Sequence, residues 1–485
     1  MSAEKRLMYI NGEWVDAQEG RSFDVYNPAT GEVCFEVADA KREDMARAVA
    51  CANAAKAEWA GLAHTQRGAL LSKVGELLLE RQADLAGILC TESGSWMGKC
   101  MFETGYCPNI LRMAAATTYN SIGEIIPSEY GKLTLVVNKP LGTIGVISPW
   151  NFPLLLSLRG LAMALAAGNT VVHKPSEETP VSGGLMIAEL FDAAGFPKGV
   201  FNVVTCSRDQ VVEVGDELVS NPGIDGISFT GSTAVGKQIA AKCGGLLKKA
   251  CMELGGKDPL IVLDDADLDR AIDATVFGAF MHQGQICMSA ERILVHESVA
   301  DEMIKGVTAR AEALNMGDPT DFGNIIGPII NQKQLDNIHS QVTDAVAKGA
   351  KIHTGGEYEG LFYRPTVISS VTRDMRIFTD ETFGPVAPFI TFSTDDEALE
   401  IANDSDYGLS AGIITRDEKR GLAIAQRLHS GMAHINDCPV FDEPHMPFGG
   451  VKNSGMGRHG GKWAIDSFTE PHLISLERGG RNFPF

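Results

Sequence analysis

The sequence predicts an α/β protein with two open, mostly parallel-sheet domains and a small β appendage. Two stretches, 142–262 and about 260–440, alternate short apolar strands with helix-like segments, a pattern that builds parallel sheets covered on both faces. The segment 119–140 and the tail Ser467–Leu476 are instead β-prone, so we expect them to pair outside the main bodies. The predicted division is 1–118 with 141–252 for the first domain, 253–465 for the second, and 119–140 with 466–485 for the appendage.

The individual elements follow from local signals. Asn11-Gly12 inside Tyr9–Val15 is typical of a hairpin turn, and the Ala/Leu/Glu-rich segment Arg42–Cys90 predicts two or three helices. Thr179-Pro180 supplies an N-cap and first-turn pair for a helix that ends at Gly195. Strands are expected at Gly145–Ser148, Thr170–His173, Val200–Val204, Gly226–Phe229, Ile293–Val295 and Thr366–Ile368, with helices ending at Ala167 and spanning Asp209–Leu218 and Thr233–Ala241.

Composition narrows the functional classes. The chain has 485 residues, of which 44% are hydrophobic and 21% charged, and its net charge is −20. A chain of this size buries enough surface to fold without a metal or a disulfide. Its negative field repels nucleic acids and anionic membranes, and no basic patch offsets it. We therefore expect neither as a partner.

The ten cysteines are scattered, with no C-x-x-C pair and no histidine at zinc-ligand spacing, so no metal site is predicted. Dispersed thiols in an acidic chain are typical of a reducing compartment, and Met1–Arg6 lacks the apolar core of a signal peptide. The most apolar stretch, Leu154–Val172, is interrupted by Arg159 and by glycines, which favours a core helix running into a strand. We expect a cytoplasmic protein.

Two segments are placed to bind a phosphorylated ligand. The turn Phe229–Lys237 follows a strand and opens a helix, so the backbone N–H groups near Gly231 and Ser232 face whatever binds there. A nucleoside triphosphate loop is disfavoured because Gln238 stands where Ser or Thr would hold Mg²⁺, and a simple glycine-capped turn stays open. Lys174 and Glu177 lie just past a strand end, where they could grip ribose hydroxyls.

Three residue types indicate acyl chemistry. Cys287, beside Gly284 and small polar residues, is a candidate nucleophile, although a lone cysteine is more often part of the core. Glu253, followed by two glycines, has the freedom that a late general base needs. Asn151, in a loop held by two prolines, suits an oxyanion donor, or else forms a turn before a helix. The nearby His282 leaves a cysteine hydrolase open.

Together these segments make the chain recognisable: it resembles the NAD(P)-dependent aldehyde dehydrogenase superfamily over nearly its whole length. Seven signatures occur in the family's order, and Glu253 and Cys287 have the family's separation. The resemblance implies a Rossmann-like cofactor domain, an α/β catalytic domain and oligomerisation strands. The signatures are Pro149–Pro153, Lys174–Glu177, Phe229–Thr233, Glu253–Lys257, Gly284–Cys287, Glu381–Pro385 and Pro447–Gly450.

The resemblance also implies roles. Cys287 would attack the aldehyde, Asn151 and the Cys287 backbone N–H would hold the oxyanion, and Glu253 would activate the water that hydrolyses a thioester. The expected cofactor is NAD, because a carboxylate at position 177 disfavours a 2′-phosphate, with NADP left open as a second cofactor. The expected cofactor-binding residues are Lys174, Glu177, Gly231, Ser232, Glu381, Phe383, Trp150 and Ser148.

The substrate prediction is an aromatic aldehyde. Residues 282–289 and 442–450 resemble the family branch that acts on benzaldehyde, vanillin and salicylaldehyde, and the apolar Ile286 and Met288 beside the thiol suit a planar ring. No arginine stands beside Cys287 to receive a substrate carboxylate, which disfavours a semialdehyde. A semialdehyde or aliphatic aldehyde dehydrogenase and a non-catalytic relative are the alternatives. The family further implies a homodimer or homotetramer.

Overall fold

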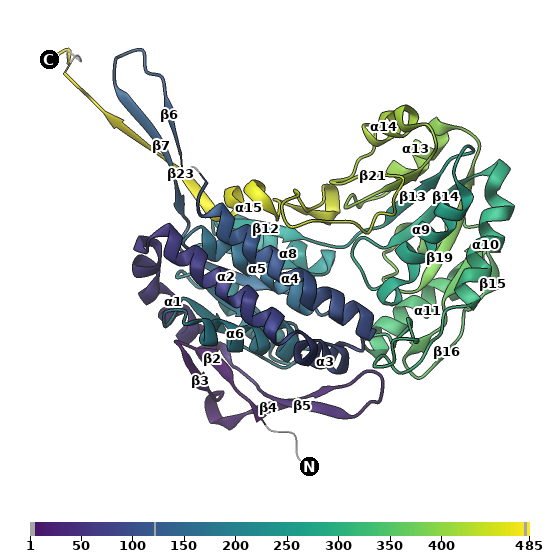
Figure 1. The fold of residues 1–485 in the computed structure, drawn as a ribbon, viewed down its shortest axis with the longest axis horizontal. Helices are drawn as coiled ribbons and strands as arrows, with labels where there is room; N and C mark the ends of the chain where they lie inside the picture. The colour runs from purple at the N-terminus through teal and green to yellow at the C-terminus, as the bar shows by residue number, and fades with distance from the viewer. Residues whose placement is uncertain (1–4, 121–122, 480–482) are drawn as a thin grey trace.

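The computed structural model describes residues 5–120, 123–479 and 483–485, and it consists of two α/β bodies and a projecting β appendage. In Figure 1 the purple-to-teal body at the left holds the first sheet, and the green body at the right holds the second. The appendage extends away from the first body, on the side remote from the second. The predicted α/β class with two sheet-based bodies is confirmed.

The first body is built on an eight-stranded sheet in the order β22-β12-β11-β8-β9-β10-β2-β3. Its five central strands are parallel, and antiparallel strands close both edges. The chain runs outward from β8 through β9 to β10, then returns to place β11 and β12 on the other side of β8. The crevice outside the carboxyl ends of β8 and β11 is therefore a topological switch point, where open α/β sheets bind ligands. The strands are β2 (Met8–Ile10), β3 (Glu13–Val15), β8 (Thr143–Ile147), β9 (Thr170–Lys174), β10 (Phe201–Val203), β11 (Gly226–Thr230), β12 (Lys249–Glu253) and β22 (Gly455–Met456).

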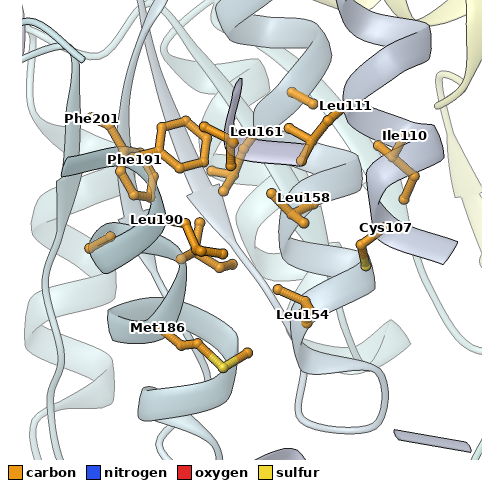
Figure 2. Close-up of a cluster of buried hydrophobic side chains, with 14 of the residues drawn as sticks. Cys107, Ile110, Leu111, Leu154, Leu158, Leu161, Met186, Leu190, Phe191 and Phe201 are labelled. Carbon is orange, nitrogen blue, oxygen red and sulfur yellow. The ribbon is translucent and has the colours of Figure 1, made fainter. Parts of the chain in front are cut away.

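Helices cover this sheet and enclose its largest core. Figure 2 shows leucines of α5 between Cys107, Ile110 and Leu111 of α4 on one side and Met186, Leu190 and Phe191 of α6 on the other. Every residue of α5 is buried, which explains its almost uninterrupted apolar sequence. The helices of this body are α1 (Arg42–Gly61), α2 (His64–Glu80), α3 (Gln82–Ser93), α4 (Met97–Thr117), α5 (Pro153–Ala166), α6 (Met186–Ala194), α7 (Val211–Ser220), α8 (Thr233–Gly245) and α15 (Gly461–Phe468).

The second body has a seven-stranded sheet in the order β15-β18-β19-β14-β13-β20-β21. All neighbours are parallel except β15 and β18. The strands are β13 (Asp258–Val262), β14 (Ala290–His296), β15 (Lys351–Thr354), β18 (Thr366–Ser369), β19 (Val386–Phe392), β20 (Gly412–Ile414) and β21 (His434–Ile435). The helices are α9 (Leu268–Phe280), α10 (Ala300–Glu312), α11 (Gln332–Ala347), α12 (Arg376–Thr379), α13 (Asp395–Asn403) and α14 (Glu418–Ala425).

The appendage is a three-stranded antiparallel sheet in the order β23-β7-β6. β7 (Leu133–Pro140) is paired along its whole length with β23 (Thr469–Leu476), and with β6 (Gly123–Ile126) on its other side. The tail therefore pairs with the 119–140 segment, as the sequence indicated. Residues 1–4, 121–122 and 480–482, which belong to the predicted first domain and appendage, lie outside the described residues.

Two local features differ from the sequence prediction. β22 pairs with β12 and α15 packs against α4 and α5, so residues 455–465 lie on the first sheet and not in the second body. The helix after Thr179 is capped by Glu92 of α3, whose carboxylate accepts from the backbone N–H groups of Val181 (2.8 Å) and Ser182 (2.6 Å). The carboxylate of Glu92, distant in sequence, therefore caps the helix in place of the expected Thr179 side chain, and local sequence cannot reveal such a cap.

Candidate active site

Two cavities meet at Cys287, in the junction between the bodies. The first, of about 180 Å³, is lined from the first body by Trp150 and Gly231 and from the second by Glu381 and Phe383. The other, of about 420 Å³, has mostly aromatic walls. Cys287, Asn151 and Leu156 line both cavities, so one thiol is reached from two sides.

Cys287 lies in the loop between α9 and β14, and its side chain is half-buried. The approach to it is strained: His282 (φ 49°) and Gln283 (φ 56°) are non-glycine residues in the left-handed region, as is Phe383 (φ 50°) across the cavity. Such strain concentrates where the surrounding fold over-determines a functional geometry. Burial, followed by the nearby Glu253 carboxylate, raises the pKa of the Cys287 thiol well above its usual value. The resting thiol is therefore protonated at neutral pH.

Glu253, the last residue of β12, is the base positioned for this thiol. Its side chain is buried, and burial raises its pKa to about 7, with the interaction with the Cys287 thiol lowering it in part. Oε1 has no protein partner in the described part of the chain. A buried carboxylate that titrates near neutral pH can both accept and release a proton there.

The two glycines after Glu253 are required by close packing. A Cβ at Gly255 would lie 2.4 Å from a carboxylate oxygen of Glu381, and one at Gly256 would lie 2.4 Å from the Cys287 carbonyl oxygen. Positions 255 and 256 must therefore be glycine, because any larger residue would clash with Glu381 or with the Cys287 backbone.

Asn151 projects from the loop after β8 toward the Cys287 loop. Its Nδ2 donates to the backbone carbonyl of Gln285 at 3.0 Å, and the amide is buried. An amide nitrogen carries two hydrogens, and in the described part of the chain the second has no protein acceptor. This places one free donor beside the thiol, as an oxyanion hole requires.

The cysteine-hydrolase alternative fails at His282. The ring is buried, neither nitrogen has a partner in the described part of the chain, and burial lowers its pKa well below the usual value. The ring packs edge-on against Phe152 at 5.4 Å. A neutral, desolvated imidazole cannot supply the positive charge that stabilises a thiolate in such enzymes.

The first cavity has the groups that a dinucleotide needs. α8 begins at Thr233, its N-cap Ser232 makes no side-chain capping bond, and no acidic residue stands in the first turn of this fully described helix. Since Thr230, Gly231 and Ser232 line the cavity, the free N–H groups and positive end of the helix face it. The expected residues Gly231 and Ser232 are therefore brought to the site.

Glu381, Phe383 and Trp150 lie around the same cavity. Glu381 accepts from the Gly256 N–H at 3.0 Å, and burial, then the Glu291 carboxylate, raises its pKa to about 8. The Phe383 ring meets the Trp150 ring edge-on at 5.4 Å. Glu291, which sequence reasoning missed, accepts from the N–H groups of Thr382 and Phe383, both at 2.7 Å, and thereby holds this loop.

The remaining expected cofactor residues lie outside the lining of this cavity. Lys174 ends β9 and is buried, and Glu177 forms an ion pair with Arg208 at 2.9 Å. Ser148 is turned into the interior, where its hydroxyl meets Nε2 of His173 (2.8 Å) and accepts from Ser157 (2.7 Å). The structure thus brings Trp150, Gly231, Ser232, Glu381 and Phe383 to one cavity but not the Ser148 hydroxyl.

The second cavity has the apolar character that the sequence indicated. Ile286 and Met288 line it on either side of the thiol. Its aromatic lining residues are Trp96, Phe102, Tyr106, Phe152, Phe277, Phe441 and Phe448.

An arginine does line this cavity, contrary to the inference drawn from the neighbourhood of Cys287. Arg159 of α5 lies over the Phe448 ring at 3.9 Å and is ion-paired with Asp442, to which Tyr106 also donates. Arg159 and Asp442 are 283 positions apart, so adjacency along the chain could not reveal them. The available signal was Arg159 itself, the single charged residue in a fully buried helix.

Comparison with known proteins agrees with this geometry. The model of the aldehyde dehydrogenase family matches residues 14–474. The chain is 43% identical over 478 residues to a protein of Pseudomonas putida named benzaldehyde dehydrogenase (NAD(+)), covering 98% of this chain and 97% of the relative. The chain belongs to the aldehyde dehydrogenase family, which confirms the recognition from seven ordered signatures.

Two solved structures of relatives are also similar to this chain in three-dimensional fold. The crystal structure of a salicylaldehyde dehydrogenase from Pseudomonas putida G7 complexed with salicylaldehyde has a TM-score of 0.97 and 38% identity, covering 99% of this chain and 100% of that one. A succinate-semialdehyde dehydrogenase from Burkholderia pseudomallei has a TM-score of 0.94 and 37% identity, covering 97% and 98%. The fold is therefore shared by relatives whose names differ in substrate.

Proposed function

We propose that this protein oxidises an aromatic aldehyde to the carboxylic acid, using NAD. The observation that carries the proposal is the Cys287–Glu253 pair at the meeting point of two cavities, one lined by a helix N-terminus and the other by aromatic rings. The relatives named for benzaldehyde and salicylaldehyde support the substrate class.

The first step uses the thiol, the base and the amide donor. Glu253 takes the proton of Cys287, and the thiolate adds to the aldehyde carbon to form a thiohemiacetal. The free N–H of Asn151, together with the Cys287 backbone N–H, stabilises the negative charge that develops on the aldehyde oxygen.

The residues at the first cavity fit a bound dinucleotide. The N-terminus of α8 at Gly231 and Ser232 would hold the pyrophosphate, Glu381 a ribose, and Trp150 with Phe383 the nicotinamide end, while Lys174 and Glu177 would hold the adenosine ribose. When bound, NAD supplies the acceptor for the hydride that leaves the former aldehyde carbon.

The second step returns the enzyme to its starting state. After Glu253 has released the thiol proton to solvent, it removes a proton from the water that attacks the thioester carbon on Cys287. The carbon–sulfur bond breaks, the acid leaves, and the thiol regains a proton.

The second cavity favours a neutral ring over a charged chain. Its single arginine is already neutralised by Asp442, so a substrate carboxylate would have to displace an existing buried ion pair. Aromatic walls contribute offset-stacked and edge-to-face contacts to a planar ring. A semialdehyde dehydrogenase is the alternative.

The test is NADH formation with benzaldehyde, hydroxylated and methoxylated benzaldehydes, succinic semialdehyde and a short aliphatic aldehyde, with the Cys287→Ala variant beside the wild type. We expect kcat/KM to be highest for the aromatic set, and turnover to vanish in Cys287→Ala while NAD binding persists. Preference for the semialdehyde would overturn the substrate class. Unchanged turnover in Cys287→Ala would overturn the mechanism.

We further propose a cytoplasmic homodimer or homotetramer assembled through the appendage. Among the described residues, no helix has the length and apolarity needed to cross a bilayer. Neither outer strand of the β23-β7-β6 sheet is paired on its far side within the described chain, and exposed edges of this kind invite a second copy.

A further inference from the structure

A buried ion pair on α4 contacts the oxyanion loop, and its lysine, Lys99, also lies in the wall of the second cavity. Lys99 and Glu103 are one helical turn apart, their side chains are 2% and 0% exposed, and Lys99 Nζ lies 2.5 Å from Glu103 Oε2. Taking two charges out of water is costly, so a buried pair is weak evidence for a contribution to stability. Neither residue has a place in the two reaction steps described above.

Both members of the pair hold the loop that carries Asn151. Lys99 Nζ donates to the backbone carbonyl of Asn151 at 2.8 Å and lies 4.1 Å from the centre of the Phe152 ring. Glu103 Oε1 accepts from the N–H of Leu155, in the first turn of α5, at 2.9 Å. The N-cap residue Phe152 has no side-chain acceptor, so Glu103 supplies the missing cap from another helix.

The geometry points to Lys99 and Glu103 as positioning residues that fix the oxyanion donor Asn151 against the Cys287 loop. This inference rests on the proposed function, because it assigns the pair a role through Asn151. One end of Asn151 is fixed by Lys99 at the backbone, and the other by the side-chain bond to the Gln285 carbonyl. With both ends held, the remaining amide N–H keeps a single direction before substrate arrives, which is what makes such a donor effective.

The variant that separates positioning from folding changes both charges together. Lys99→Met alone leaves Glu103 buried without its partner and is expected to unfold the chain or destabilise it strongly. Lys99→Met with Glu103→Gln removes both charges, and the glutamine oxygen can still accept from Leu155. The pair variant therefore retains the helix cap and loses the bond to the Asn151 carbonyl.

The measurement is the rate of NADH formation in a single turnover, with benzaldehyde limiting and the NAD-saturated enzyme in excess. We expect Asn151→Ala to slow this turnover about a hundredfold or more. The pair variant should slow it about tenfold or more, since a donor displaced by about an ångström loses much of its effect. The dissociation constant for NAD, measured by calorimetry, should change less than about twofold in both.

A double-mutant cycle tests whether the pair acts through Asn151. Adding the pair substitution to Asn151→Ala should cost less than about twofold more, because the side chain being positioned is gone. Losses that multiply would show that the pair acts by another route and would overturn the inference.

Thr104→Val is the matched control. Thr104 lies on the same helix, is buried, and donates to the Cys100 carbonyl at 2.8 Å without touching the Asn151 loop. It should turn over at the wild-type rate. An equal slowing in this control would indicate general loosening of α4 and would overturn the positioning role.

The outcomes also separate the two proposals. If Asn151→Ala retains the wild-type rate, the oxyanion role in the proposed function fails. If Asn151→Ala is slow but the pair variant turns over normally, the proposed function stands and the positioning role of Lys99 and Glu103 is wrong.

Discussion

The protonation of Glu253 and that of Cys287 are coupled, because both side chains are removed from solvent and lie close together. The carboxyl has its pKa raised to about 7, and the thiol has its pKa raised well above its usual value, partly by that carboxylate. Because the two groups interact, an observed apparent pKa belongs to the pair. Both steps need Glu253 ionised at the moment it accepts a proton, so the ionised population limits the rate.

We therefore expect kcat/KM for NADH formation to fall with decreasing pH through about 7, approaching tenfold per pH unit below it, since protonated Glu253 cannot act as a base. Above that pH the carboxylate is present and this limb flattens. In Glu253→Gln the limb should disappear and kcat/KM should fall about a hundredfold or more, because neither the Cys287 thiol nor the hydrolytic water then has a base. A limb near the ordinary pKa of a glutamate, 4.5, would contradict the burial argument.

Near the expected position of the adenosine ribose of the cofactor, the side chains of Glu177 and Arg208 carry opposite charges. The Glu177 carboxylate would repel the 2′-phosphate of NADP, while Arg208, held at 2.9 Å, would attract it once freed. In Glu177→Ala, the ratio of kcat/KM with NAD to kcat/KM with NADP is expected to fall about tenfold. Adding Arg208→Ala should remove most of that gain. An unchanged ratio in Glu177→Ala would exclude the carboxylate from the ribose site.

At the scale of elements, sequence predicted what local patterns determine. Asn11-Gly12 does turn between β2 and β3, and three helices fill 42–93 where two or three were expected. Contacts between distant segments were missed: the Glu92 cap of the helix after Thr179, Arg159 with Asp442, and Lys99 with the Asn151 loop. Each joins a charge to a group that becomes its neighbour only after the helices pack, so no spacing along the chain predicts it.

The same distinction applies to the site. Cys287, Glu253 and Asn151 could be selected because glycines and prolines mark the loops that carry them, and those loops converge at the switch point of the first sheet. Ser148, which precedes the signature Pro149–Pro153, was expected from the family resemblance, but the side chain of a residue at a strand end can turn to either face. Here it turns inward to His173.

At the scale of the molecule, the exposed apolar residues of the appendage predict assembly. Leu473 is 62% exposed and Leu476 53% exposed on β23, an outer strand of a sheet that projects from the first body. Exposed apolar side chains on an unpaired strand promote association, and they become buried when a second copy pairs with that strand.

Leu473→Lys is therefore expected to shift the mass measured by light scattering toward a smaller species, with little effect on the fold of each chain. Leu422→Lys, at a 53% exposed leucine on α14 of the second body, should leave the mass unchanged. An unaltered mass in Leu473→Lys, or an equal shift in Leu422→Lys, would mean that β23 does not carry the contact between copies.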